Sequence, residues 1–278
     1  MASVLMTGKG TAGSWLIRGQ QLGEAIGAEI QPMAEPHDCR QADLVVVVKR
    51  TPGTIIQAIR ATGRRWVWDI VDAWPQPVGN NWSRDQAIDW LRTELRRLQP
   101  DAVVFPTHRM QEDACFTGPS ITVPHHAWGK YKPAPLRERV RIVGYEGAAH
   151  YLGRWERIVR EECERRGWEF RVNGDMQDAD IGIALRDADG YPAQHWKSNC
   201  KQANLQALGI PCLLSRESGY VECASGAECW IDTDADIARA FDAVAPLEAR
   251  QEIRRQQLRA APRIETIAKE YREWLDSL

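Results

Sequence analysis

Short apolar, β-branched runs alternate with amphipathic stretches along the first half of the chain. Strands are predicted at 3–7, 42–50, 66–71, 101–107 and 120–124. Helices are predicted at 14–28, 51–65 and 83–98. The last helix begins with a capping box, because Gln86 follows Ser83 by three residues. Alternation of this kind is typical of βαβ units built on a parallel sheet.

A proline-rich, charged stretch, GKYKPAPLRER at 129–139, interrupts this pattern and is typical of an interdomain linker. A second α/β series follows the linker. Its strands are predicted at 140–147, 168–174, 180–187 and 210–215, and its helices at 151–166 and from about 198. The sequence therefore predicts an α/β protein with a first domain at 1–130, a second at 131–262, and a final helix at 263–278.

Composition narrows the class of protein. The 278 residues are 44% hydrophobic and 27% charged, as in globular proteins. The sequence contains no apolar run near the roughly 20 residues that cross a bilayer, and its first residues do not resemble a secretion signal. Seven cysteines without a CxxC pair fit reduced thiols, so we expect a cytoplasmic protein. The net charge of -2 neither implies nor excludes nucleic acid as a partner.

The strongest local signal lies in the segment 196–215. Ser198 is predicted to cap a helix whose first turn holds Asn199 and Lys201. The exposed N–H groups and the positive dipole end of such a helix suit a diphosphate, and Lys197 and Lys201 add charge. An ordinary capped helix with two solvated lysines is the alternative interpretation.

This segment resembles the donor-binding half of GT-B glycosyltransferases, the group that includes glycogen synthase. The family's A-x-G-x-P pattern matches residues 207–211, ALGIP. The stretch 215–241 resembles the family's acidic loop and closing helix, and 122–133 resembles its interdomain segment, followed by the strand RIVGYEG at 141–147. The resemblance implies two Rossmann-like domains facing each other across a cleft. It also implies that the final helix packs back toward the first domain.

The function implied by this resemblance is metal-independent transfer of a sugar from a nucleotide-diphosphate sugar to a hydroxyl acceptor, with no cofactor. The donor would lie between the strand end near Tyr145 and the helix beginning at Ser198. Arg186 is expected either to meet a phosphate or to form a salt bridge at the rim. The glycine loop at 8–14 would lie beneath the donor sugar, which makes Gly10, Gly13 and Ser14 candidates.

One departure from the family concerns its acids. Retaining members often carry two glutamates eight positions apart, and the corresponding residues here are Trp196 and Asn204. Asn204 would then make the ribose contact, and the first acid has no counterpart. Glu217 and Glu222 are nearby candidates for a carboxylate. The alternatives are a noncatalytic GT-B-shaped binding or scaffold protein and a sugar-nucleotide epimerase.

Polar residues at predicted strand ends supply further candidates. Asp69 and Asp72 follow a strand, where either could act as base for an acceptor hydroxyl or could cap a turn. His126, beside His125 at the predicted hinge, is expected to line the cleft or to make a hinge hydrogen bond. Two histidines without a third ligand do not predict a metal site. The acceptor, which could be a glycan, a small metabolite or a modified DNA base, and the oligomeric state stay open.

Overall fold

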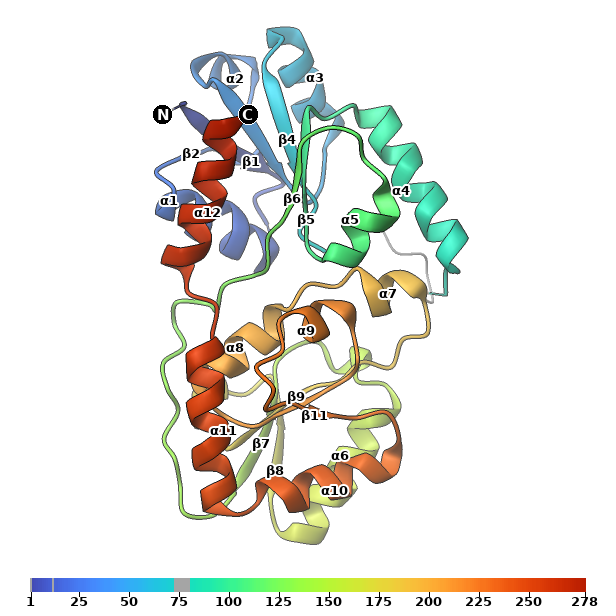
Figure 1. Cartoon of the computed structure of the whole chain (residues 1–278), viewed down its shortest axis with the longest axis vertical. Helices are drawn as coiled ribbons and strands as arrows, with labels where there is room; N and C mark the ends of the chain where they lie inside the picture. Colours follow the sequence, from blue (N-terminus) through green and yellow to red (C-terminus); the bar gives the residue numbers. More distant parts are fainter. Residues whose placement is uncertain (1, 12, 73–80) are drawn as a thin grey trace. The chain divides into compact units, whose positions relative to one another are not determined.

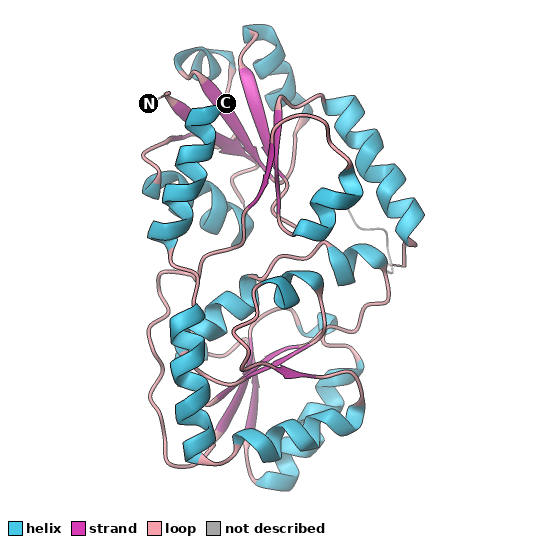
Figure 2. Ribbon diagram, in the orientation of Figure 1, coloured by secondary structure: helices cyan, strands magenta, loops and turns pink. Residues whose placement is uncertain are grey.

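The computed structural model describes residues 2–11, 13–72 and 81–278. Contacts among these residues divide the chain into two compact units. The first comprises Met1–His125, Gly190–Ser198 and Arg263–Leu278, and the second comprises His126–Asp189 and Asn199–Pro262. In each unit helices flank a parallel sheet (Figures 1 and 2). The α/β fold predicted from the sequence is confirmed.

The sheet of the first unit has six parallel strands in the order β2-β1-β3-β4-β5-β6. The strands are β1 (Val4–Gly8), β2 (Glu29–Ile30), β3 (Leu44–Val48), β4 (Arg65–Asp69), β5 (Ala102–Phe105) and β6 (Ser120–Thr122). Val45 and Val47 of β3 enter one hydrophobic cluster, whereas Val46 and Val48 enter another. Both faces of the sheet are therefore covered, which explains the unbroken apolar run.

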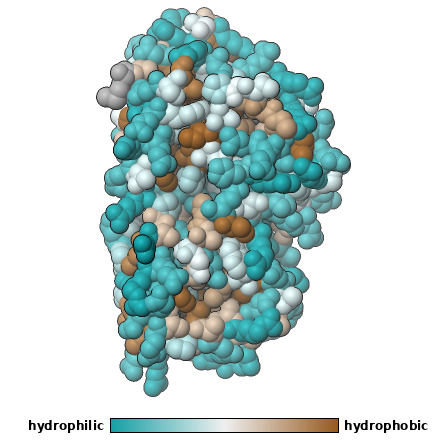
Figure 3. Space-filling model, in the orientation of Figure 1, coloured by the Kyte–Doolittle hydropathy of each residue, from teal (hydrophilic) through white to brown (hydrophobic). Residues whose placement is uncertain are grey.

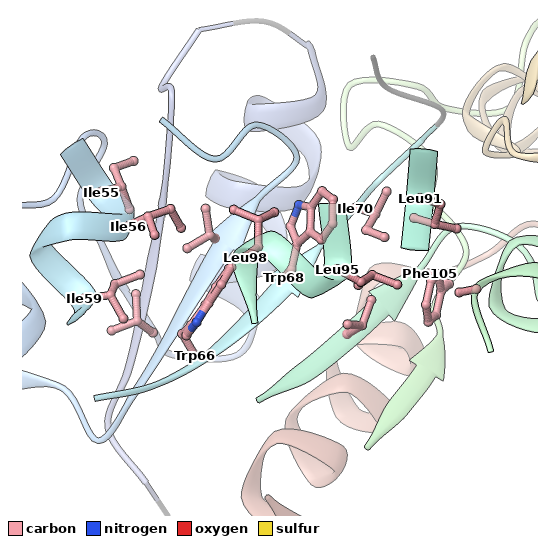
Figure 4. Close-up of a cluster of buried hydrophobic side chains, with 14 of the residues drawn as sticks. Ile55, Ile56, Ile59, Trp66, Trp68, Ile70, Leu91, Leu95, Leu98 and Phe105 are labelled. Atoms are coloured by element: carbon pink, nitrogen blue, oxygen red, sulfur yellow. The ribbon is translucent and has the colours of Figure 1, made fainter. Parts of the chain in front are cut away.

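Helices supply both of these clusters. The helices of the first unit are η1 (Trp15–Gln21), α1 (Leu22–Ala25), α2 (Pro36–Gln41), α3 (Gly53–Thr62), α4 (Arg84–Leu98), α5 (His108–Ala114), α7 (Tyr191–His195) and α12 (Ile264–Ser277). Residues of α3 and α4 pack against Trp66 and Trp68 of β4 (Figure 4). η1, α1 and α12 contribute to the other cluster. The predicted capping box of α4 is confirmed, with Gln86 N donating to Ser83 Oγ.

Residues 190–198 pack in the first unit although they lie between segments of the second. The buried carboxylate of Asp113 on α5 accepts hydrogen bonds from the Tyr191 hydroxyl, at 2.7 Å, and from Trp196 Nε1, at 3.0 Å. Trp196 is buried in the cluster beneath α3 and α4. The domain predicted at 131–262 is therefore interrupted, because a carboxylate far away in the sequence holds this segment.

The sheet of the second unit has five parallel strands in the order β11-β10-β9-β7-β8. The strands are β7 (Ile142–Tyr145), β8 (Glu169–Val172), β9 (Ile181–Ala184), β10 (Cys212–Leu214) and β11 (Cys229–Trp230). The helices are η2 (Ala149–Tyr151), α6 (Arg154–Arg166), η3 (Met176–Asp178), α8 (Cys200–Leu208), α9 (Ser218–Glu222), α10 (Asp234–Val244) and α11 (Leu247–Ala260). Gly167 and Gly209 end α6 and α8 in the left-handed conformation, as predicted.

The surface and the helix lengths bear on membrane association. Among the described residues, every helix is too short or too polar to cross a bilayer. Hydrophilic residues predominate on the face shown in Figure 3, where apolar residues form scattered patches.

The close packing of α8 on β9 depends on Gly182, since a Cβ at this position would overlap the buried side chain of Leu205. We expect Gly182→Ala to lower the free energy of unfolding by about 1–3 kcal/mol, because a packed core has no room for the methyl group. Urea unfolding would measure the change. Gly53→Ala is the control, since nothing lies within 4 Å of a Cβ there. Equal stability of the two variants would contradict the expectation.

Candidate functional site

The strand order of the second unit marks a site at the carboxyl ends of β7 and β9. β7 and β9 are neighbours in the sheet, and the chain leaves β7 toward β8 on one side but leaves β9 toward β10 on the other. Open parallel sheets bind ligands at such a switch point, outside the carboxyl ends of the strands. Tyr145 and Glu146 come at the end of β7, and Arg186 follows β9. Glu217 follows β10, the next strand in the sheet.

Lys201, in the first turn of α8, contacts the end of β7. Its Nζ donates to the Tyr145 hydroxyl at 2.7 Å and lies 4.0 Å from the centre of the Tyr145 ring. Burial, with a smaller effect of Arg186, lowers the pKa of Lys201 to about 7. Burial also raises the pKa of Tyr145 to about 12, so the hydroxyl stays protonated. Lys201 is therefore an ammonium group that is poised to lose its charge near neutral pH.

The loop after β7 passes directly over this lysine. Gly147 has φ 142°, and a Cβ there would lie 2.9 Å from Lys201 Nζ. Its amide donates to Asn173 Oδ1 at 2.8 Å, which holds the loop in place. Residues with a Cβ rarely adopt this φ, which favours glycine at the position.

Arg186 and Glu217 form an ion pair beside Lys201. Arg186 Nε donates to Glu217 Oε1 at 3.0 Å, and the guanidinium lies over the Tyr151 ring at 5.4 Å. Against the effect of burial, Glu217 raises the pKa of Arg186. The Arg186 amide also donates to Ser215 Oγ at 3.1 Å. Arg186 was expected either to meet a phosphate or to form a salt bridge, and the structure contains the salt bridge.

Asn204 contacts a carboxylate that sequence reasoning missed. Its Nδ2 donates to Glu146 Oε2 at 2.9 Å, and its Oδ1 accepts from the Trp128 amide at 2.9 Å. The Tyr131 hydroxyl donates to Glu146 Oε1 at 2.6 Å. Glu146 is partly exposed at the strand end. Its place between the strand and Gly147 was the signal available in the sequence.

The start of α8 differs from the prediction by one residue. The N-cap is the buried Asn199, whose side chain makes no capping hydrogen bond. Ser198 and Lys197 belong to the first unit, whereas Asn199 and Lys201 belong to the second. Lys197 lies 3.6 Å from Asp72, so its charge is paired within the first unit.

The first unit has its own switch point, at β1, which lies between β2 and β3. The residues that follow β1 and β3 line a pocket of about 110 Å³. Its lining consists of Lys9, Gly10, Thr11, Ser14, Trp15, Val48, Lys49 and Arg50. The candidate Ser14 is thus part of a pocket, whereas the candidate Gly13 is exposed beside it.

Two strained residues flank Asp72 at the neighbouring strand ends. Lys49 has φ 61° and Val71 has φ 69°, a conformation that is costly for residues with a Cβ. Lys49 Nζ donates to Asp72 Oδ2 at 3.0 Å. Although burial raises it, Lys197 and Lys49 lower the pKa of Asp72 to about 2. A carboxyl group with so low a pKa is a weak general base.

Comparisons with known proteins agree with this geometry at the level of fold. No protein-family model and no curated protein sequence matches the chain. HepE of Anabaena, crystallised with UDP-glucose, is similar in structure with a TM-score of 0.69 at 12% identity over 100% of both chains. The lipopolysaccharide outer core galactosyltransferase WaaB has a TM-score of 0.56 at 10% identity over 99% of both chains. MurG of Acinetobacter baumannii has a TM-score of 0.52 at 11% identity over 100% of both chains.

The chain has the GT-B glycosyltransferase fold. At these identities the likeness concerns the fold alone. The two positions at which the resemblance implies glutamates hold Trp196 and Asn204 instead, and the structure gives each of these residues a partner. Trp196 is buried against Asp113, and Asn204 is bonded to Glu146.

Asp69 lies in the interior of the first GT-B unit. It is fully buried, 3.4 Å from Arg18 Nε, and accepts a hydrogen bond from the Tyr271 hydroxyl at 3.1 Å. Burial raises the pKa of Asp69, and Arg18 and Tyr271 offset part of that effect. This position suits a carboxylate that orders η1 and α12 better than one that meets a substrate. The residues AWPQP at 73–77 lie outside the described residues.

The remaining candidates are more dispersed. His126 is buried and is the first residue of the second unit. Glu222 is exposed at the end of α9. Within residues 2–11, 13–72 and 81–278, no three His, Cys, Asp or Glu side chains are grouped to hold a metal ion.

Proposed function

We propose that this protein transfers a sugar from a nucleotide-diphosphate sugar to a hydroxyl acceptor. The observation that supports this function is the position of Lys201, partly buried in the first turn of α8 against the end of β7. A helix N-terminus and an ammonium group at a switch point form a site for a diphosphate. HepE, with the same fold, was crystallised with UDP and with UDP-glucose. We therefore propose a uridine nucleotide as the first donor to test.

In this proposal the diphosphate accepts hydrogen bonds from Lys201 and from the first N–H groups of α8. The bond from the sugar to the diphosphate breaks as the acceptor oxygen bonds to the sugar. Negative charge develops on the leaving diphosphate, which takes up the proton of the acceptor hydroxyl. Fixed positive groups in a partly buried site stabilise that charge more than water would. No step needs a metal ion.

In the same proposal, Glu146 makes the ribose contact that was expected of Asn204. Both side-chain atoms of Asn204 are engaged, and one of them holds the carboxylate of Glu146. A partly exposed carboxylate at the end of β7 suits the hydroxyls of a ribose. Asn204 is then a positioning residue, and Glu217 likewise positions Arg186.

A second candidate is a noncatalytic protein that binds a sugar nucleotide. The burial of Trp196 at the place of the family's first acid favours it, since no carboxylate can act there. The two candidates differ in one measurement. A transferase releases UDP from UDP-glucose in the presence of an acceptor, or slowly to water, whereas the binding protein retains UDP-glucose intact.

Donor binding is expected to weaken as pH rises. Lys201, with a pKa of about 7, carries its charge below that pH and loses it above. If only the ammonium form binds the diphosphate, affinity for UDP-glucose falls about tenfold from pH 6 to pH 8. UDP-glucose is the proper probe because its diphosphate, esterified at both ends, keeps a constant charge across this range. Calorimetric titration at constant ionic strength measures the change.

The control for this pH dependence is Lys201→Arg, in which the guanidinium stays charged at both pH values. The dependence should vanish in this variant whether its affinity is high or low. A fall of equal size in wild type and variant would assign the titration to another group. Affinity that rises with pH would contradict the role of Lys201.

A further inference from the structure

The pocket at the switch point of the first unit is cationic. Lys9, Lys49 and Arg50 line it, together with the hydroxyl side chains of Thr11 and Ser14. None of the described residues that line it is acidic. Positive groups that converge on a concave surface from two separate loops attract a negatively charged ligand.

The carboxylate of Asp72 is shared between two lysines. Asp72 lies 3.0 Å from Lys49 Nζ and 3.6 Å from Lys197 Nζ, so one negative charge is shared between two positive ones. The ammonium group of Lys49 has three N–H donors, and one of them forms a hydrogen bond with Asp72. The buried Asp69 is paired with Arg18. Lys9 and Arg50 line the same pocket and bring further positive charge to it.

The backbone holds Lys49 at this place in a strained conformation. Its amide donates to the Asp69 carbonyl at 2.7 Å, and its carbonyl accepts from Trp68 Nε1 at 2.9 Å. Both bonds keep φ at 61°, where glycine or asparagine would be less strained. Strain of this kind is concentrated at ligand sites. The fold thus presents a lysine where local energetics favour a smaller residue.

We propose that this pocket binds an oxyanion group, a phosphate or a carboxylate, on the acceptor substrate. The inference rests on the proposed transferase function, which provides for a second substrate. A cavity of about 110 Å³ has room for the charged group of an acceptor. Thr11 and Ser14 supply hydroxyl donors for oxygens that the cations do not contact.

The test is calorimetric titration of the whole protein with inorganic phosphate, glucose 6-phosphate, glucuronate and glucose at constant ionic strength. We expect phosphate and glucose 6-phosphate, or glucuronate, to bind, and glucose not to bind. Tighter binding of glucose 6-phosphate would identify the oxyanion as a phosphate, and tighter binding of glucuronate would identify it as a carboxylate. The variant Lys9→Ala/Arg50→Ala should lose roughly tenfold in affinity for each cation removed.

The matched control is Arg40→Ala/Lys269→Ala, which removes the same charge from exposed positions of the first unit outside the pocket. It should bind the oxyanion as wild type does. An equal loss in the control would overturn the proposal, since general charge would explain it. Binding of phosphate that is lost in Lys201→Ala would place the anion in the other unit and overturn it too.

Titration with UDP-glucose separates the two proposals. If wild type binds UDP-glucose but neither phosphate nor glucuronate, only the proposal of an oxyanion pocket is overturned. Failure to bind UDP-glucose or any other nucleotide-diphosphate sugar overturns the proposed function, whereas pocket-dependent phosphate binding would still establish the oxyanion site. We expect Lys9→Ala/Arg50→Ala to bind UDP-glucose within about twofold of wild type.

Discussion

Lys201→Met is expected to lower the affinity for UDP-glucose by at least about 100-fold at pH 6. Hydrogen bonds to a charged group contribute about 1.5–3 kcal/mol each, and this ammonium is proposed to meet a diphosphate in a partly buried site. Methionine keeps the length and apolar stem of the side chain, so α8 retains its packing. Calorimetric titration measures the affinity, and unfolding in urea checks that the variant is folded.

Two controls define the role of Lys201. Tyr145→Phe removes only the hydroxyl that accepts from Lys201 Nζ, so we expect a loss of about tenfold or less. Lys269→Met changes an exposed lysine of the first unit and should leave affinity as in wild type. Unchanged UDP-glucose binding by folded Lys201→Met would remove the main support for the donor site.

Asp69→Ala is expected to lower the free energy of unfolding by about 3–5 kcal/mol. The substitution leaves the buried guanidinium of Arg18 without its carboxylate and removes the acceptor of the Tyr271 hydroxyl. η1 and α12 meet at this pair, so the first unit should lose stability as a whole. Urea unfolding followed by circular dichroism measures the loss.

Comparison with nearby substitutions tests whether the effect is structural. Tyr271→Phe removes one hydrogen bond and should cost about 1 kcal/mol. Asp72→Ala alters a partly exposed ion pair and should cost less than Asp69→Ala. If Asp69→Ala instead kept wild-type stability and abolished only sugar transfer, the catalytic role predicted from the sequence would be correct.

The two positions where the family resemblance implies acids show what a local motif can predict and what it cannot. The A-x-G-x-P pattern at 207–211 located α8 and its C-terminal glycine, because these features depend on neighbouring residues. The partner of Asn204 is Glu146, which is 58 residues away in the sequence. No local pattern relates the two, since only the packing of α8 beside β7 brings them together.

The sequence by itself determined the elements whose causes are local. Apolar runs predicted the central strands, and Ser83 with Gln86 predicted the start of α4. Gly167 and Gly209 predicted the ends of α6 and α8. Each depends on bonds within a few residues or on a repeat of 2 or 3.6 residues, which a single stretch of sequence contains.

The tertiary structure decided the roles of residues whose partners are remote. Asp113 draws 190–198 into the first unit through bonds to Tyr191 and Trp196. Asp69 and Asp72 have the same side chain and are three residues apart, yet one is sealed beside Arg18 and the other lies between two lysines. Burial and charged neighbours set the chemistry of a carboxylate, and both arise only when distant segments pack together.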